Sequence, residues 1–217
     1  MDVILNGEYK GCYQLCDQIT TDKARVPITD MEPTDEQEPE LTGGYLLEID
    51  GYGGQEKSMF YSSHGTPVTI KSPDEDDITT SQHNYIKDYF NDLEYLVWSN
   101  QYTDPVKGYR SKLDLTSWLK YFLLEELTGN TDAYHSTYIY KERDSVRFVV
   151  SPGWDFDLGF NNDNRYYPVD DNDYWNTLTR TYGAGDMINF VKRIFSDPET
   201  WKQASSIWAE ARSSGTF

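Results

Sequence analysis

The spacing of hydrophobic positions changes along the chain, and each change marks a different kind of secondary structure. In the first 73 residues apolar and polar side chains tend to alternate, which predicts strands. The stretch "VILNGEYKGCYQL" predicts a β-hairpin, because Asn6-Gly7 is a strong two-residue turn signal between strand-like runs. "GYLLEID" and "PVTIKSP" predict two more strands, and Pro73 closes the second.

Residues 20–42, between the hairpin and these two strands, are rich in Pro, Glu, Asp and Thr and hold almost no large apolar side chain. A segment of this composition buries too little apolar surface to offset the entropy lost on ordering. The sequence therefore predicts an exposed, mobile acidic loop.

From Thr79 onward the apolar positions recur at helical spacing. One amphipathic helix is predicted over about 80–100. A second begins at Asp114 or Thr116, either of which can cap it, and runs to Gly129, a common C-terminal stop. Its apolar residues cover most of its circumference, so we expect it to be the buried central helix of this section.

The last third of the chain predicts a hairpin followed by two helices. "STYIYKERDSVRFVVSPGW" contains two strand-like runs over about 136–151, joined by a polar turn at 142–145. Apolar positions between Met187 and Phe195 mark one further helix, and Trp201, Ile207 and Trp208 mark the last, with Pro198 in its first turn. The element order predicts an α+β fold.

Composition narrows the possible partners. The 217 residues carry 37 acidic and 19 basic side chains, a formal net charge of −18, which repels nucleic-acid phosphates and anionic lipid at long range. No stretch approaches the ~20 apolar residues of a membrane span. We therefore expect neither nucleic-acid binding nor membrane insertion. Cys12 and Cys16 lie about 13 Å apart along a strand, beyond the ~7 Å that a disulfide allows, so two free thiols are expected.

Three carboxylates bracket the predicted hairpin. Asp132 precedes its first strand in "TGNTDAYHSTYIY", and Asp155 and Asp157 follow its second strand in the apolar setting of "SPGWDFDLGF". Because hairpin strands are antiparallel, the segments entering and leaving it emerge at one end, so Asp132 and Asp155 are expected to be neighbours. Such a cluster suits a divalent cation such as Mg²⁺. Alternatively, Asp132 caps a turn and the other two accept hydrogen bonds from backbone amides.

These residues carry a family resemblance. "LNGEYKGCYQLCDQI", "GGYLLEID", "PVTIKSPDEDD", "FLLEELTGNTDAYHSTYIYK" and "SPGWDFDLGF" together resemble the CotH family of spore-coat and cell-surface proteins, which are atypical, kinase-like enzymes. The most specific part is "GNTD" and "WDFDLGF" on either side of a hairpin. The resemblance covers about residues 3–160 in the same order, and it implies that the chain starts inside the small lobe, without the family's upstream basic residues.

The resemblance implies a divergent protein-kinase-like fold in a single domain over 1–217. Residues 1–78 would form a β-rich small lobe, and residues 79–217 a mainly helical large lobe carrying the catalytic hairpin. In protein kinases one Asp accepts or orients the substrate hydroxyl, and an Asp further along the chain holds Mg²⁺. The resemblance assigns the first, catalytic role to Asp132 and the second role to Asp155. If its segment is extended, Asp157 points to the same side and becomes a second metal ligand or supports the first.

The cation that contacts the ATP phosphates is assigned to Lys71, at a strand end, in preference to Lys10 in the first hairpin and Arg110 before the buried helix. Glu48 is the residue that would orient this lysine. Alternatively, Glu48 is simply one of the strand residues that alternate toward solvent, which explains its presence equally well. For Lys71 the alternative is an exposed lysine on the flank of a strand.

The sequence departs from the family at two positions. Relatives tend to carry an Asn a few residues after the catalytic Asp, as the usual second metal ligand, where this chain has His135, Ser136 and Thr137. The family favours Glu at the end of the first hairpin, where this chain has Asp17. The acidic segment "NNDNRYYPVDDND" lacks the spacing of a calcium-binding loop and is expected to be a solvated loop.

The leading functional hypothesis is an atypical protein kinase that uses Mg²⁺ with ATP as co-substrate and phosphorylates protein hydroxyls. A second hypothesis is a kinase-like surface or spore-coat module without turnover, whose partners are coat or surface proteins. A weaker third is a glycan hydrolase with two working carboxylates. The resemblance implies an extracellular or cell-surface location.

Overall fold

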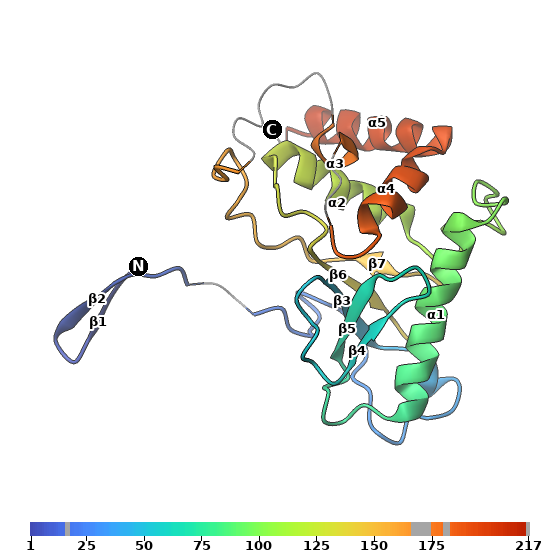
Figure 1. The fold of residues 1–217 in the computed structure, drawn as a ribbon, viewed down its shortest axis with the longest axis horizontal. Helices are drawn as coiled ribbons and strands as arrows, with labels where there is room; N and C mark the ends of the chain where they lie inside the picture. Colours follow the sequence, from blue (N-terminus) through green and yellow to red (C-terminus); the bar gives the residue numbers. More distant parts are fainter. Residues whose placement is uncertain (16–17, 166–174, 180–182, 216–217) are drawn as a thin grey trace.

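The computed structural model describes residues 1–15, 18–165, 175–179 and 183–215. Within them the fold is α+β, with a two-stranded sheet, a five-stranded sheet and five α-helices. Figure 1 shows the large sheet covered along one side by a long helix and followed by a group of helices, with the small sheet standing apart.

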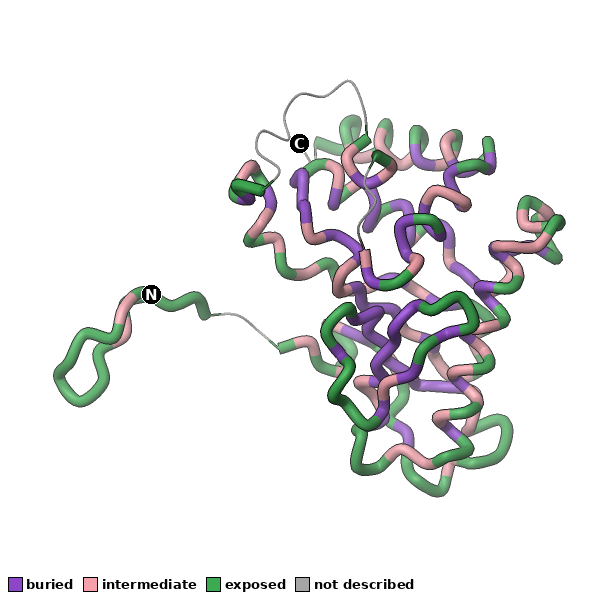
Figure 2. Tube along the Cα trace, viewed as in Figure 1, coloured by how far each residue is buried: buried purple, intermediate pink, exposed green. Residues whose placement is uncertain are grey.

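The small sheet is the predicted N-terminal hairpin. Strands β1 (Asp2–Leu5) and β2 (Glu8–Cys12) pair antiparallel through a turn in which both Asn6 and Gly7 have positive φ, 54° and 81°. Asn-Gly adopts this left-handed backbone conformation more readily than most other residue pairs do. Most of the hairpin is exposed (Figure 2).

The large sheet is antiparallel with strand order β4-β5-β3-β6-β7. Its strands are β3 (Tyr45–Asp50), β4 (Met59–Tyr61), β5 (Pro67–Ser72), β6 (Ser136–Lys141) and β7 (Val149–Val150). The predicted hairpin over 136–151 is therefore present as β6 and β7, but β6 pairs along its whole length with β3. A boundary at residue 78 thus does not separate the sheet from a helical lobe, because strands from both sides of it share one sheet.

The central strand β3 is buried on both faces. Tyr45, Leu47 and Ile49 belong to the main core with the helices, whereas Leu46 packs in a smaller cluster with Val26 and Tyr138 on the opposite face. Because side chains alternate along a strand, Glu48 also lies on the second face. Figure 2 shows the buried segments concentrated in the sheet and on the helices beside it.

Helix α1 (Thr80–Trp98) covers the first face of the sheet. Thr79 begins it with a capping box, in which its hydroxyl accepts from the Gln82 amide and the Gln82 side chain accepts from the Thr79 amide. The residues that α1 buries against the core include Ile86, Phe90 and Val97. The helix predicted over about 80–100 is confirmed.

Helix α2 (Leu115–Thr128) is capped as predicted by Asp114, whose carboxylate accepts from the Ser117 amide, and ends at Gly129 with φ of 60°. It packs with α3 (Asn176–Thr179), α4 (Met187–Phe195) and α5 (Pro198–Ser213), of which α3 was not predicted. Its burial is less complete than predicted, because Leu124 and Leu127 are 38% and 43% exposed.

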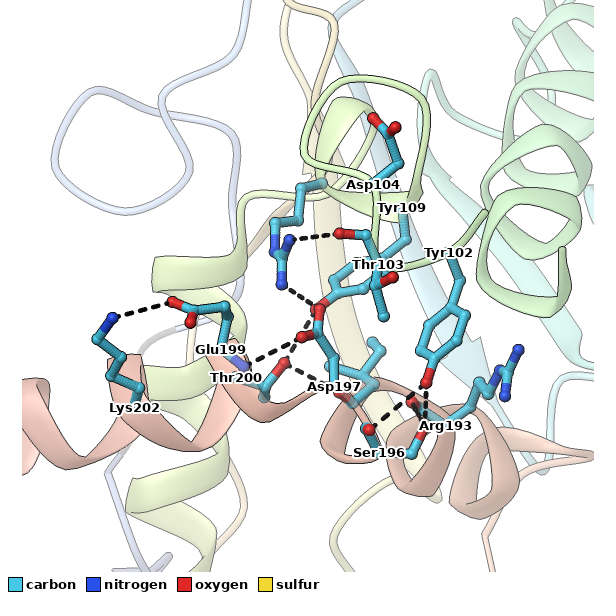
Figure 3. Close-up of polar contacts among 12 residues, drawn as sticks. Tyr102, Thr103, Asp104, Tyr109, Arg193, Ser196, Asp197, Glu199, Thr200 and Lys202 are labelled. Atoms are coloured by element: carbon cyan, nitrogen blue, oxygen red, sulfur yellow. Dashed lines mark hydrogen bonds and ion pairs between the residues drawn. The ribbon is translucent and has the colours of Figure 1, made fainter. Parts of the chain in front are cut away.

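A buried acidic network joins these helices to the segment before α2 (Figure 3). Asp197 is 2% exposed and caps α5 by accepting from the Glu199 amide at 3.0 Å. The same carboxylate accepts from the Tyr109 hydroxyl at 3.3 Å and pairs with the Arg110 guanidinium. Arg110, one of the alternative phosphate-binding cations, is thus engaged at the start of α5.

The acidic loop over 20–42 contains no α-helix or strand, as expected, but it is anchored to the body. Val26 and Met31 are 0% and 8% exposed, and the Gln82 side chain donates to the carbonyl oxygen of Glu32 at 2.8 Å. Arg143 forms an ion pair with Asp35 at 3.0 Å. These contacts argue against the free mobility that the loop's composition predicts.

The same loop covers a buried lysine. Lys141, at the end of β6, is 1% exposed, donates to the carbonyl oxygen of Thr42, and lies 4.7 Å from the centre of the Tyr89 ring. Burial, and secondarily the charge of Lys112, lowers the pKa of Lys141 from 10.5 to about 8. In the unfolded chain Lys141 keeps its ordinary pKa of 10.5. As the pH rises, the folded protein therefore loses the Lys141 proton at a lower pH than the unfolded chain does.

Stability should consequently rise with pH between about 8 and 10, because there the unfolded chain binds more protons than the folded chain at Lys141. We expect Lys141→Met to remove about 1–2 kcal/mol of this rise, measured by urea unfolding of both proteins at pH 8, 9 and 10. Parallel stability profiles for the two proteins would contradict the assignment.

Candidate active site

The second face of the large sheet presents polar side chains from three neighbouring strands. Glu48 of β3 is directly opposite Thr69 of β5 on one side and Tyr138 of β6 on the other. Directly paired residues point to the same face, and so does Ser136, two positions along β6 from Tyr138. Lys71 is the extra residue where the β3–β5 register shifts, and its ammonium group reaches Glu48. The pairing register therefore brings these side chains together.

Glu48 and Lys71 form an ion pair at the centre of this face. The Lys71 Nζ lies 3.2 Å from Glu48 Oε2 and 2.8 Å from Glu56 Oε1. Glu48 also accepts hydrogen bonds from the Tyr138 hydroxyl at 2.9 Å and from the Ser136 hydroxyl. Since Glu48 is 7% exposed, the interpretation of it as a solvent-facing strand residue is wrong.

The environment shifts two pKa values in this cluster. Burial, followed by the charge of Glu48, raises the pKa of the Tyr138 phenol well above its usual range. Partial burial of Lys71 acts to lower its pKa, but hydrogen bonds and charges from Glu56 and Glu48 outweigh it and raise the pKa of Lys71 overall. Lys71 is therefore a fixed positive charge at neutral pH.

Lys71 and Asp155 line one cleft of about 1010 Å³. Its apolar wall includes Leu46, Tyr138 and Trp154; the indole of Trp154 packs edge-on against the Tyr138 ring, 5.3 Å between ring centres. Other lining residues come from the N-terminal part of the chain: Gln14, Gln18, Ile19, Thr20, Thr21 and Arg25. The cleft thus combines an apolar wall with charged groups of both signs.

The three predicted aspartates gather at one end of the β6–β7 hairpin. The carboxyl groups of Asp155 and Asp157 share a hydrogen bond, and the charge of Asp132 acts on Asp155. Partial desolvation first, then Asp157, then Asp132, raises the pKa of Asp155. The neighbourhood of Asp132 and Asp155 expected from antiparallel strands is therefore present.

Two features of this segment differ from what its sequence suggests. Asp155 and Asp157 are both exposed, although aromatic and aliphatic residues surround them in the sequence. The segment is not extended at Asp155, which has a left-handed φ of 57°. Such a conformation is uncommon outside glycine. The two carboxyl groups are therefore not brought together by the alternation of an extended strand, and they contact each other through a hydrogen bond.

Asn130 connects the two halves of the cluster and was not identified from the sequence. Its side chain is 4% exposed; Oδ1 accepts from the Asp132 amide at 3.1 Å, and Nδ2 donates to the Asp155 carbonyl oxygen at 3.3 Å. The only sequence signal was its position two residues before Asp132 in "GNTD". A buried side-chain amide with both ends engaged fixes the spacing between the two aspartate segments.

Thr131, the residue after Asn130, makes a second contact that holds the segment leading to Asp132. Thr131 donates to the buried Asp163 carboxylate at 2.6 Å, and Arg165 pairs with the same carboxylate at 2.8 Å. The Arg165 side chain, the largest cause, holds the pKa of Asp163 well below its usual range. Of the segment considered as a calcium loop, residues 166–173 lie outside the described residues.

The donor chemistry of the aspartate cluster fits Mg²⁺. Within the described ranges no group of three or more His, Cys, Asp or Glu side chains is placed to hold a metal ion. Mg²⁺, however, is commonly held by one or two carboxylates together with substrate phosphates and water. Asp155 and Asp157 supply such a pair, since their carboxyl groups lie close enough to share a hydrogen bond.

Comparison with protein families decides the chain's membership. The family model described as "CotH kinase protein" matches residues 1–214. The chain belongs to the CotH family. Comparisons with curated proteins and with solved structures give no match.

The sequence of this CotH chain also singles out several other residues. Lys10 pairs with Glu8 on the exposed hairpin at 2.6 Å. Cys12 is a free, exposed thiol, while Cys16 and Asp17 lie outside the described residues. Ser136, in the stretch that replaces the family's Asn, donates to Glu48. Among the helices that the structure describes, none has the length and hydrophobicity to cross a bilayer.

Asp157→Asn should lower the pKa of Asp155 toward its usual range, because the change removes the nearest like charge and supplies a hydrogen-bond donor. Carbon-13 NMR titration of the carboxyl groups in metal-free protein measures it. Asp88→Asn, at an exposed position on α1, is the matched control. An unchanged pKa of Asp155 in Asp157→Asn would show that the two carboxyl groups do not interact.

Proposed function

We propose that this CotH protein is an ATP-dependent phosphotransferase that moves the γ-phosphoryl group of ATP to a protein hydroxyl. The observation that carries the proposal is the shared cleft of Lys71 and Asp155, in which Lys71 is held by buried Glu48 and Asp155 lies beside Asp132. A fixed cation opposite a carboxylate pair suits a polyphosphate with a divalent cation.

Each residue has a separate role in this proposal. Lys71 contacts the phosphates, and Glu48 keeps its ammonium group in place. Asp155, supported by Asp157, holds Mg²⁺, which neutralises charge on the phosphates when bound. Asp132 orients the acceptor hydroxyl and takes its proton as the oxygen attacks the γ-phosphorus, and ADP departs with the electrons of the broken P–O bond.

Phosphoryl transfer of this kind depends mainly on positioning and charge stabilisation. The contacts made by Asn130 serve this requirement, because they link the Asp132 backbone to the Asp155 backbone. Membership of the CotH family supports an acceptor among surface or coat proteins, and a surface or coat location. The net charge of −18 disfavours nucleic acid as an acceptor.

Asp132→Asn and Asp155→Asn separate chemistry from binding. We expect Asp132→Asn to retain stabilisation by Mg-ATP and to lose about 10²- to 10⁴-fold in transfer rate, as removal of a general base does. Asp155→Asn should lose most of the Mg²⁺-dependent stabilisation. Thermal unfolding with and without Mg-ATP measures binding, and mass spectrometry of autophosphorylation measures transfer.

Asp88→Asn is again the control, and it should behave as the unmodified protein in both assays. If both site variants bound Mg-ATP and autophosphorylated like the unmodified protein, the proposal would fail. A lack of any stabilisation by Mg-ATP in the unmodified protein would instead favour a non-catalytic surface module.

A further inference from the structure

Arg25 is a second cation on the wall of the cleft that holds Lys71 and Asp155. It comes from the acidic loop, 46 positions before Lys71 in the sequence, and its position there is set by contacts on both sides. The Asp22 carboxylate accepts from the amides of Ala24 at 2.6 Å and Arg25 at 3.1 Å. On the other side, Val26 is fully buried.

The buried contact of Val26 explains why this part of the loop faces the cleft. Val26 packs in a cluster with Leu46 and Tyr138, which are themselves lining residues. The backbone of Arg25 is thus held between a side-chain-capped turn and an apolar anchor. A side chain presented from a fixed backbone loses less entropy on binding a ligand than one on a free loop.

The positive charge of Lys71 is already offset by neighbouring carboxylates. The Lys71 ammonium contacts two carboxylates, Glu48 and Glu56, so one positive charge is matched by two negative ones. Asp74 and Asp155 also line the cleft. A triphosphate entering beside Lys71 alone would meet a local excess of negative charge, and a divalent cation at Asp155 would offset only part of it.

We propose that Arg25 binds the phosphates of the nucleotide together with Lys71, an inference that rests on the proposed function of the cleft. The guanidinium is suited to this role because it stays charged at all physiological pH values and donates two parallel hydrogen bonds to phosphate oxygens. Lys71 then acts as a fixed point charge, and Arg25 supplies the additional positive charge and the directional contact.

The test compares ligands that differ only in phosphate. Arg25→Met should weaken binding of Mg-ATP by about 10-fold or more, the loss expected for a charge-assisted hydrogen-bonded contact, and leave binding of adenosine unchanged. Arg25→Lys should restore part of the lost Mg-ATP affinity, because lysine returns the positive charge but cannot donate the two parallel hydrogen bonds of a guanidinium. Isothermal titration with Mg-ATP and with adenosine measures both affinities.

Lys23→Met is the matched control, since Lys23 is an exposed cation of the same loop outside the cleft lining. It should keep the affinity of the unmodified protein for Mg-ATP, which excludes an effect of net charge alone. Thermal unfolding without ligand checks that each variant is folded, and Arg25→Lys provides the comparison if Arg25→Met is not.

The outcomes separate this inference from the proposed function. If the unmodified protein binds Mg-ATP and Arg25→Met binds it equally well, the role of Arg25 is overturned and the proposed function stands. Equal losses for adenosine and Mg-ATP would also overturn it, because they would show a general distortion of the cleft. If the unmodified protein does not bind Mg-ATP, both are overturned together.

Discussion

The arrangement of the cleft depends on the pairing of Glu48 with Lys71. A carboxylate on the central strand of a sheet covered on both faces is costly unless a cation and hydrogen-bond donors surround it. Glu48 has Lys71 from β5 and the hydroxyls of Tyr138 and Ser136 from β6. Because these partners come from both neighbouring strands, satisfying one buried charge also fixes the face on which the cleft forms.

The other side of the cleft follows from the antiparallel hairpin β6–β7. Its entering and leaving segments lie together, so the residues before β6 and after β7 supply Asp132 and Asp155, with Asn130 as the link between them. Since β6 also pairs with β3, the aspartate cluster and the Glu48–Lys71 pair are positioned by one continuous sheet. Relative movement of two separate lobes is not needed to bring them together.

The sequence predicted those parts of the fold that have local signals. Asp114 and Gly129 mark the ends of α2, and Asn6-Gly7 marks the first hairpin. The placement of β6 beside β3 has no local signal, because it depends on pairing between residues about 90 positions apart. The anchoring of the acidic loop was missed because its average composition concealed Val26 and Met31. For the same reason Arg25 was not among the candidate cations, and Asn130 acts through geometry that only the folded backbone provides.

The central claim is that one cleft holds the phosphates at Lys71 and the metal at Asp155. The most direct measurement is a crystal structure with a non-hydrolysable ATP analogue and Mn²⁺, whose anomalous scattering locates the metal. The account predicts an anomalous peak at about 2.0–2.2 Å from an Asp155 carboxylate oxygen, a coordination distance typical of small divalent cations, with phosphate oxygens within hydrogen-bonding distance of the Lys71 Nζ. A nucleotide bound elsewhere, or a metal peak distant from Asp155, would contradict it.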